Sequence, residues 1–372
     1  MHTFETICRI GGIQYRYLHD NLPSLTRVSQ YVERSNYYAG KGITQIELKA
    51  YEYPDSGIMR HEHYLVLRCN PSVIMGDSRM LLVDLEKYSA REILERLQHR
   101  LYEINQFRYI RLYRLPLAMF LARTAHMAVD IQHDFPQLIV WLCNMSFPYP
   151  YHRMERAKIN KPAETLYLES CCFGNKSRRV NVYHKMIAAV NTGREIDANE
   201  FDIISRTVRL EIQLEKSGIC NMKLPSKRSL EPFLDKGFCR PYVEEEIKAI
   251  FGTGKYVSRS RAKEIINGSA FKPYDKAVML SVLDMIPRFK GLYELEKAIA
   301  DESVHTPTQY GNIRVFKERW LKKFKQLGIQ PATIPDIAGI DEIPSIYDLM
   351  ANNDTYGADD TANKCPSAAD GG

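Results

Sequence analysis

The sequence lacks several features that would place it in a familiar class of protein. Its 8 cysteines are scattered without a C-x2-C pair, so neither a structural zinc site nor a disulfide framework is expected. No apolar run approaches the length of a membrane span, and the start at Met1 has neither the basic residues nor the apolar run of a signal peptide. We therefore expect a cytoplasmic protein with no membrane partner.

A strong charge bias is also missing. The chain has 51 Lys and Arg against 45 Asp and Glu, a net charge of +6 that permits binding to nucleic acid without demonstrating it. The hydrophobic fraction of 45% supports a folded core and excludes wholesale disorder.

The length of 372 residues and the change of pattern along the chain suggest three parts. Residues 1–223 mix strand-like alternation with helical spacing, whereas residues 224–350 show helical spacing alone and suggest a DNA-binding or accessory domain. Residues 351–372, which are poor in apolar side chains, are expected to be disordered.

Hydrophobic periodicity predicts the order of the elements. The predicted strands are 43–51, 60–68, 107–121, 178–185 and 206–215, and the predicted helices are 93–104 after a capping box at Ser89–Glu92, 124–143, 242–251, 259–267, 274–286 and 288–301. This order predicts an α+β fold, in which an antiparallel sheet has helices on one face and leaves the other free.

Two of these strands would bring chemically useful side chains to one surface. Strand residues alternate between faces, so Tyr183 and Lys185 share a face of the strand at 178–185. On the strand at 206–215, Arg209 and Glu211 alternate with Val, Leu and Ile. If the two strands lie in one sheet, all four polar side chains share a surface.

Such a surface has two interpretations. A phenol can attack a phosphodiester when a cation neutralises the phosphate, and a carboxylate can hold that cation. However, tyrosine is common in strands, and alternating Arg and Glu are typical of a solvated sheet face. The residues alone leave both interpretations open.

A family resemblance favours the first. The motifs that carry it lie in order between about residues 43 and 350, and they are Asn70–Gly76, Leu166–Leu168, Asn175–Ser177, Val180–Lys185, Val208–Leu214 and Leu327–Pro335. Their order resembles the phage and plasmid replication proteins related to gene II protein of filamentous phages, and more distantly the plasmid rolling-circle initiators. Each motif alone is loose.

The resemblance implies a nickase-like fold and a rolling-circle replication initiator, which nicks one strand of origin DNA and becomes linked to the 5′ phosphate. Carried over by position, it implies Tyr183 as the nucleophile, Lys185 as a phosphate or proton partner, and Glu211 as a carboxylate of a Mg²⁺ or Mn²⁺ site. The implied partners are double-stranded and single-stranded origin DNA and the host polymerase and helicase.

One departure from the family pattern suggests a rival function. Relatives usually have Arg-x-Asp on an earlier strand, where this chain has Arg114-Leu115-Pro116, and proline supplies no ligand. Either another group completes the site, with His61, His63 and Glu47 as candidates, or the protein is a non-catalytic DNA-binding regulator of replication or transcription. The spacing of His61 and His63 puts both on one strand face, which suits either a metal site or an exposed pair.

Two basic segments are candidates for DNA contact. Lys176, Arg178 and Arg179 are either a solvated turn or a phosphate-positioning cluster near Tyr183. A helix at about 313–327 sets an aromatic stripe on one side, which we expect to be core, and cations elsewhere. These cations, which suit either solvation or contact with the DNA backbone, are Arg314, Lys317, Arg319, Lys322, Lys323 and Lys325.

Overall fold

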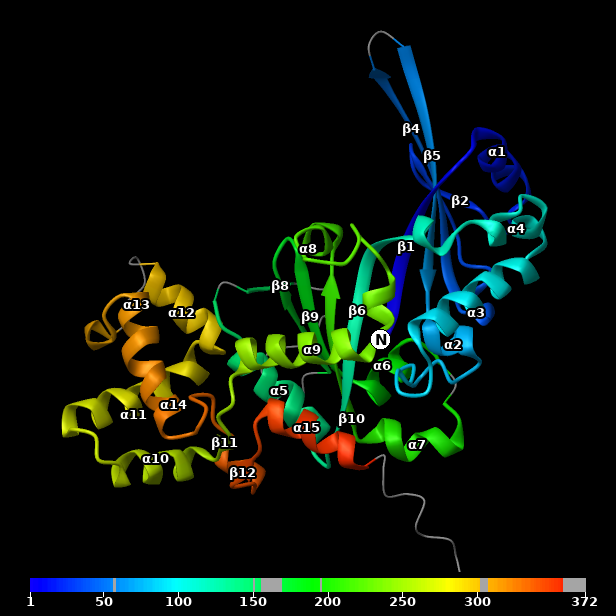
Figure 1. The fold of residues 1–372 in the computed structure, drawn as a ribbon. Helices are drawn as coiled ribbons and strands as arrows, with labels where there is room; N and C mark the ends of the chain where they lie inside the picture. Colours follow the sequence, from blue (N-terminus) through cyan, green and yellow to red (C-terminus); the bar gives the residue numbers. More distant parts are fainter. Residues whose placement is uncertain (56–57, 150, 155–168, 195, 302–306, 357–372) are drawn as a thin grey trace, which may run out of the picture. The chain divides into compact units, whose positions relative to one another are not determined.

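The computed structural model describes residues 1–55, 58–149, 151–154, 169–194, 196–301 and 307–356, and the fold is α+β (Figure 1). In the described residues a large antiparallel sheet has the strand order β2-β3-β4-β5-β1-β6-β10-β9-β8-β7. The bounds of its strands are β1 Thr3–Ile10, β2 Thr26–Ser29, β3 Val32–Ser35, β4 Ile43–Asp55, β5 Ile58–Cys69, β6 Leu121–Gln132, β7 His152–Arg153, β8 Ser170–Gly174, β9 Arg178–His184 and β10 Thr207–Leu214. A separate pair joins β11 Tyr256–Val257 to β12 Glu342–Ile343.

The helices become more frequent toward the C-terminus. Their bounds are α1 Gly12–Asn21, α2 Pro71–Met75, α3 Ala90–Glu103, α4 Asn105–Tyr109, α5 Pro136–Ser146, α6 Lys185–Asn191, α7 Ala198–Ser205, α8 Lys216–Cys220, α9 Lys236–Phe251, α10 Arg259–Gly268, α11 Pro273–Arg288, α12 Leu292–Ala300, α13 Ile313–Val315, α14 Lys322–Gln326 and α15 Ile346–Tyr356. A search of these helices finds none with the length and apolar character needed to cross a bilayer.

Contacts group the chain into two compact units. Unit 1 comprises Met1–Val129, Gly174–Asn181 and Leu210–Val243, and unit 2 comprises Asp130–Phe173, Val182–Arg209 and the residues from Glu244 onward. The predicted boundary between residues 223 and 224 stays a prediction.

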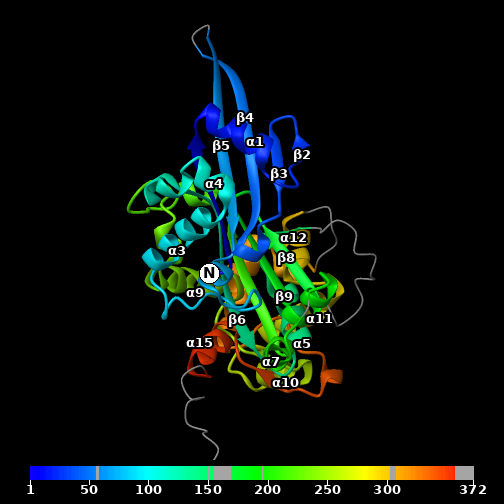
Figure 2. The ribbon, with the colours of Figure 1, turned by 90° about the vertical axis from the view of Figure 1, so that its right-hand side faces the viewer.

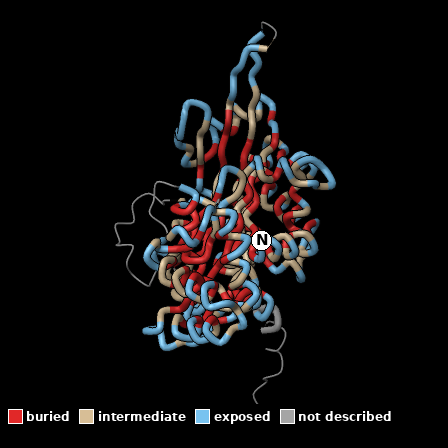
Figure 3. Tube along the Cα trace, turned by 90° about the vertical axis from the view of Figure 1, so that its left-hand side faces the viewer, coloured by how far each residue is buried: buried red, intermediate tan, exposed pale blue. Residues whose placement is uncertain are grey.

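In unit 1 the strand register separates an apolar face from a polar one. Leu67 of β5 pairs with Thr6 of β1 and with Ile46 of β4. The side chains of Leu67 and Ile46 are completely buried. On the opposite face, Tyr64 lies between Arg9 and Lys49. The outer part of the β4–β5 hairpin extends beyond α1 and is exposed along its length (Figures 2 and 3).

The helix predicted from the capping box is confirmed. Ser89 caps α3 by accepting a hydrogen bond from the Glu92 N–H at 3.2 Å, while the Glu92 carboxylate accepts from the Ser89 N–H at 2.7 Å. Ile93, Leu97 and Leu101 form its buried stripe, as their spacing predicts. The predicted strands at 43–51 and 60–68 are also confirmed, within the longer β4 and β5.

The predictions for residues 107–143 are wrong in part. No strand forms at 107–121: α4 is followed by two 3-10 turns at Leu112–Arg114 and Leu117–Met119, because Arg111 takes a left-handed conformation with φ of 56°. The strand lies later, at β6, where a helix was expected, and only α5 is helical. Pro116 is therefore not on a strand of the sheet.

Unit 2 contains most of the predicted C-terminal helices. The predictions for α10, α11 and α12 are confirmed, and Phe316, Trp320 and Phe324 are buried, which confirms that the aromatic stripe is core. A π-helical turn at Phe316–Leu321 lies between α13 and α14. The expectation of disorder from residue 351 needs correction, because α15 continues to Tyr356, and residues 357–372 lie outside the described part.

Candidate metal centre

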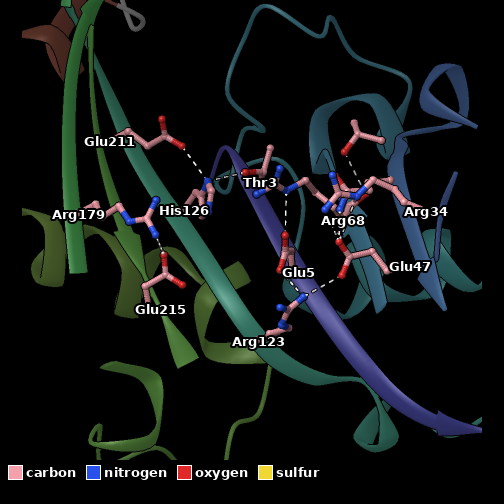
Figure 4. Close-up of polar contacts among 12 residues, drawn as sticks. Thr3, Glu5, Arg34, Glu47, Arg68, Arg123, His126, Arg179, Glu211 and Glu215 are labelled. Atoms are coloured by element: carbon pink, nitrogen blue, oxygen red, sulfur yellow. Dashed lines mark hydrogen bonds and ion pairs between the residues drawn. The ribbon is translucent and has the colours of Figure 1, made fainter. Parts of the chain in front are cut away.

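Three side chains of unit 1 form a compact group of potential metal ligands. His2, His126 and Glu211 each offer one ligand atom, and these atoms lie within 4.8 Å of one another. Glu211 Oε1 is 3.1 Å from His2 Nδ1. It is 3.0 Å from His126 Nδ1 (Figure 4). Among the described residues, no other group of three or more His, Cys, Asp or Glu side chains meets this criterion.

The group is positioned by three neighbouring strands, β1, β6 and β10. Thr3 of β1 is paired with His126 of β6, and the backbone N–H of His2 donates to the carbonyl of His126 at 2.9 Å. Glu211 lies in β10, next to β6 in the sheet. The Thr3 hydroxyl lies 2.9 Å from His126 Nδ1, the same nitrogen that Glu211 approaches, and so helps to orient the imidazole.

The electrostatics of the group favour an ionised carboxylate. Burial by itself would raise the pKa of Glu211, which is 4% exposed, but hydrogen bonds with His126 and His2 outweigh burial and hold this pKa well below its ordinary value. A buried carboxylate without a permanent cation beside it is stabilised when a metal ion supplies the positive charge.

The ligand set suits a divalent cation. Two ligand atoms that are each about 2.1 Å from one ion at right angles are about 3.0 Å apart, which agrees with the spacing around Glu211. Carboxylate suits Mg²⁺ and Mn²⁺, whereas imidazole suits transition metals. Two imidazoles and one carboxylate are therefore a ligand set that a divalent transition metal could use.

His61 and His63 do not belong to this group, so the structure does not bring them together with Glu211, and their role as ligands stays a prediction. His63 pairs with Ile10 and Ala50 on the apolar face of β5, and its ring lies 4.5 Å from that of Tyr15 in α1. His61 has the same strand parity and pairs with Glu52 at 3.1 Å. Both imidazoles are thus on the face opposite Thr3 and His126.

Glu47, the other proposed substitute ligand, is occupied by cations. Arg34 donates to its carboxylate at 2.8 Å, Lys49 Nζ lies 3.0 Å from it, and Arg123 lies 3.3 Å from it. Burial would raise the pKa of Glu47, but Arg34 and Lys49 outweigh burial and lower it. Three cations around one carboxylate leave little reason for a metal ion.

A second buried cluster lies in unit 2 and contains two of the predicted residues. Arg209 donates to Asp130 from two nitrogens at 2.6 and 2.7 Å, and Lys185 Nζ lies 3.3 Å from the same carboxylate. Arg209 is 2% exposed and pairs with Asp130, which leaves its guanidinium little surface for a DNA phosphate, and its contact with DNA stays a prediction. Lys185 begins α6 instead of ending a strand.

Burial gives this cluster unusual acid–base properties. Burial lowers the pKa of Lys185 to about 8, Asp130 opposes that change, and Arg209 adds to it. Burial would raise the pKa of Asp130, but Arg209 and Lys185 outweigh burial and lower it. The ammonium of Lys185 therefore loses its proton near physiological pH.

Tyr183 lies near the end of β9 and is neither fully buried nor fully exposed. Val180 and Val182, which alternate with its face, are completely buried, as predicted. The phenol is thus not part of the apolar core.

The turn before β9 holds the first basic segment. Asn175 Oδ1 accepts hydrogen bonds from the N–H groups of Ser177 and Arg178, and Arg179 pairs with Glu215 at 2.9 Å. Lys176 is exposed. The motif Leu166–Leu168 of the resemblance lies outside the described residues.

The second basic segment, residues 313–326, is largely paired. Arg319 and Lys323 lie 3.1 and 3.2 Å from the Asp275 carboxylate, whereas Lys322 is exposed. Arg314 pairs with Glu318, and Lys317 pairs with Glu296. Four of the six cations therefore have acidic partners, which weakens the argument for contact with DNA at Arg319 and Lys323.

Sequence reasoning missed His2, His126 and Asp130. A signal for the last two was present, because Thr124, His126, Ala128 and Asp130 alternate with apolar residues in the manner of a strand. No local pattern marks His2. When the chain was compared with known proteins, no family model matched it, and no curated protein matched it either.

Proposed function

We propose that the protein initiates rolling-circle DNA replication as a metal-dependent, site-specific nicking and joining enzyme. The observation that supports this most is the group of His2, His126 and Glu211, because Glu211 is the residue that the family resemblance marks as the metal-side carboxylate. The proposal includes the nickase-like fold, with a C-terminal helical domain that binds DNA.

The proposed reaction conserves the phosphodiester bond. The Tyr183 oxygen attacks phosphorus, the bond from phosphorus to the 3′ oxygen breaks, and the 5′ phosphate stays joined to the phenol. The phenolic proton passes to a base, and the departing 3′ oxygen takes up a proton. A host polymerase extends the free 3′-hydroxyl, and a later 3′-hydroxyl attacks the phosphotyrosine to reseal the strand.

The chain's own residues would divide the remaining tasks. A divalent cation held by His2, His126 and Glu211 would supply positive charge to the phosphate. We assign the base to Lys185, because a pKa of about 8 leaves a useful fraction of neutral amine at physiological pH. Asp130 and Arg209 hold this amine in place.

The test uses supercoiled plasmid DNA that carries the gene with its flanking sequence. With Mn²⁺ or Mg²⁺ present, the wild-type protein should convert it to open circles with covalently attached protein. Tyr183→Phe should lower the rate by at least about 1,000-fold. Tyr109→Phe, at a tyrosine 72% exposed on α4, is the matched control and should nick normally.

The rival is a DNA-binding regulator without chemistry. Its specific argument was Pro116, and that residue lies between two 3-10 turns instead of on a sheet strand. Sequence-specific binding to the same DNA without open circles, in Mg²⁺, Mn²⁺ and Zn²⁺, would favour the rival and contradict the proposal.

A further inference from the structure

A groove of about 930 Å³ lies on the polar face of the unit 1 sheet. Strands β1, β4, β5 and β6 contribute to it, together with the 3-10 segment at Leu117–Met119 and the start of α8. None of the residues in this groove belongs to the metal centre. The proposed function gives it no role so far.

Aromatic side chains follow one side of the groove. The rings of Tyr31 and Tyr51 are 5.9 Å apart, and those of Tyr51 and Tyr64 are 6.1 Å apart. Tyr31 is 45% exposed, and Tyr51 and Tyr53 are each 38% exposed. These four tyrosines are partly exposed instead of packed in the core, and their open ring faces are suited to stacking on flat ligands.

The same groove carries an excess of positive charge. Its cations are Arg9, Lys49, Arg123, Lys216 and Arg228, and its acids are Glu52 and Glu62. Arg9 pairs with Glu62, and Lys49 and Arg123 pair with the buried Glu47. The charge offered to a phosphate backbone therefore comes mainly from Lys216 and Arg228.

An ion-pair network holds two of these cations, Arg123 and Lys49, in position. Arg123 bridges Glu5 and Glu47 at 3.2 and 3.3 Å, and Arg68 and Arg34 approach the same two acids (Figure 4). Because the carboxylates are buried and the arginines are about one third exposed, the guanidinium groups are fixed at the surface before a ligand arrives.

The groove and the metal centre share one face of the sheet. On β1, Ile7 and Arg9 line the groove, and Thr3 has the same strand parity and is paired with His126. Glu5 lies between them along the strand. A ligand that leaves the groove along β1 therefore passes toward His126.

From these observations we infer that the groove binds single-stranded DNA, with bases stacked on Tyr31, Tyr51 and Tyr64 and phosphates beside Lys216 and Arg228. Only unpaired bases offer their faces to a row of tyrosines, so a single strand binds better than a duplex. The inference deepens the proposed function, on which it rests for the source of the strand. It concerns binding alone and requires no cleavage.

The experiment measures the fluorescence anisotropy of a labelled oligothymidylate of about 16 nucleotides, the upper end of known site sizes. It uses the full chain with Tyr183→Phe in EDTA, so that neither nicking nor metal contributes. Tyr51→Ala should weaken binding by about 5- to 100-fold, whereas Tyr51→Phe keeps the ring and should bind within about threefold of the parent. Tyr37→Ala, at a 64% exposed tyrosine outside the groove, should have no effect.

The charge contribution is tested separately by salt dependence. Lys216→Gln should reduce the slope of log affinity against log salt by about 0.7, the value for one phosphate contact on a single strand. Lys263→Gln, at an exposed lysine of α10, should leave the slope unchanged.

Several results would overturn the inference. These are unchanged binding in both Tyr51→Ala and Lys216→Gln, equal affinity for a duplex of the same length, or displacement of the oligonucleotide by polyglutamate at similar concentration. If the groove variants lose binding while no variant nicks, the groove is supported and the proposed function fails. If they bind normally while the wild type nicks, the reverse holds.

Discussion

The chain surrounds two carboxylates with different kinds of neighbours. Glu211 in unit 1 is 5% exposed at its side chain and meets two imidazoles, whereas Asp130 in unit 2 is 23% exposed and meets a guanidinium and an ammonium. Both carboxylates have a lowered pKa, although burial opposes the change in each. The partners differ in whether they can give up their protons.

This difference decides what each cluster can do. A neutral imidazole offers a lone pair to a metal ion, so His2 and His126 can serve as ligands. Arg209 has no lone pair to offer and keeps its charge, so Asp130 is already neutralised. The first arrangement can hold a metal, and the second positions an amine of low pKa.

Metal binding is the most direct test of the difference between the two clusters. Glu211→Gln should lower Mn²⁺ affinity by more than about 100-fold, because it removes the anionic ligand. Asp130→Asn should leave Mn²⁺ affinity within about threefold. Electron paramagnetic resonance of free Mn²⁺ measures both. Equal losses in the two variants would mean that the clusters do not differ in the way described.

For stability, we expect the Asp130 cluster to matter more than the Glu211 cluster. Arg209→Met removes the guanidinium that donates two hydrogen bonds to the Asp130 carboxylate, and we expect the free energy of unfolding to fall by about 2 kcal/mol. His2→Ala should cost less than about 1 kcal/mol, because Glu211 keeps His126 and His2 is 19% exposed at its side chain. Urea denaturation in EDTA measures both. A larger loss from His2→Ala would contradict the assignment of a structural role to Arg209.

The pH dependence should follow Lys185. Its pKa of about 8 in the folded chain lies below about 10.4, the ordinary value expected for the unfolded chain. Between these values the unfolded chain binds more protons, so stability should rise with pH across this window. If the neutral amine is the base, nicking should rise about tenfold per pH unit below pH 8 and then level off.

Asp130 supplies the control for this profile. Its negative charge raises the pKa of Lys185, so Asp130→Asn should move the bend in the nicking profile to lower pH. Lys185→Gln should remove the bend. A profile that is the same in all three proteins would show that another group controls the rate.

The sequence predicted those elements whose side-chain pattern is decided locally. The capping box at Ser89 marks the start of α3, and the alternation of 206–215 marks β10, because both signals depend on neighbours in sequence. The strand β6 was missed because Ala122, Ala125 and Ala128 favour a helix over a strand by intrinsic propensity. Their small side chains nevertheless fit a strand on which other elements pack closely.

The site itself depends on contacts that local patterns do not carry. His2 reaches Glu211 across 209 positions of sequence, through the pairing of β1 with β6. Alternation also cannot distinguish a solvated polar face from a buried one. Arg209 and Glu211 were expected on an open surface, and both are buried, because each finds a polar partner on β6.

The smallest effect should come from the Thr3 hydroxyl, which lies 2.9 Å from His126 Nδ1. Thr3→Val keeps the shape but removes the group that orients the imidazole, so Mn²⁺ affinity should fall by about tenfold. Thr124→Val on β6 is the matched control, because its buried hydroxyl has no hydrogen-bond partner among the described residues and can be lost without cost. Equal losses of Mn²⁺ affinity in the two variants would assign the effect to general loosening of β6 instead of to His126. An effect confined to Thr3→Val would extend the metal centre by one residue that no sequence pattern marks.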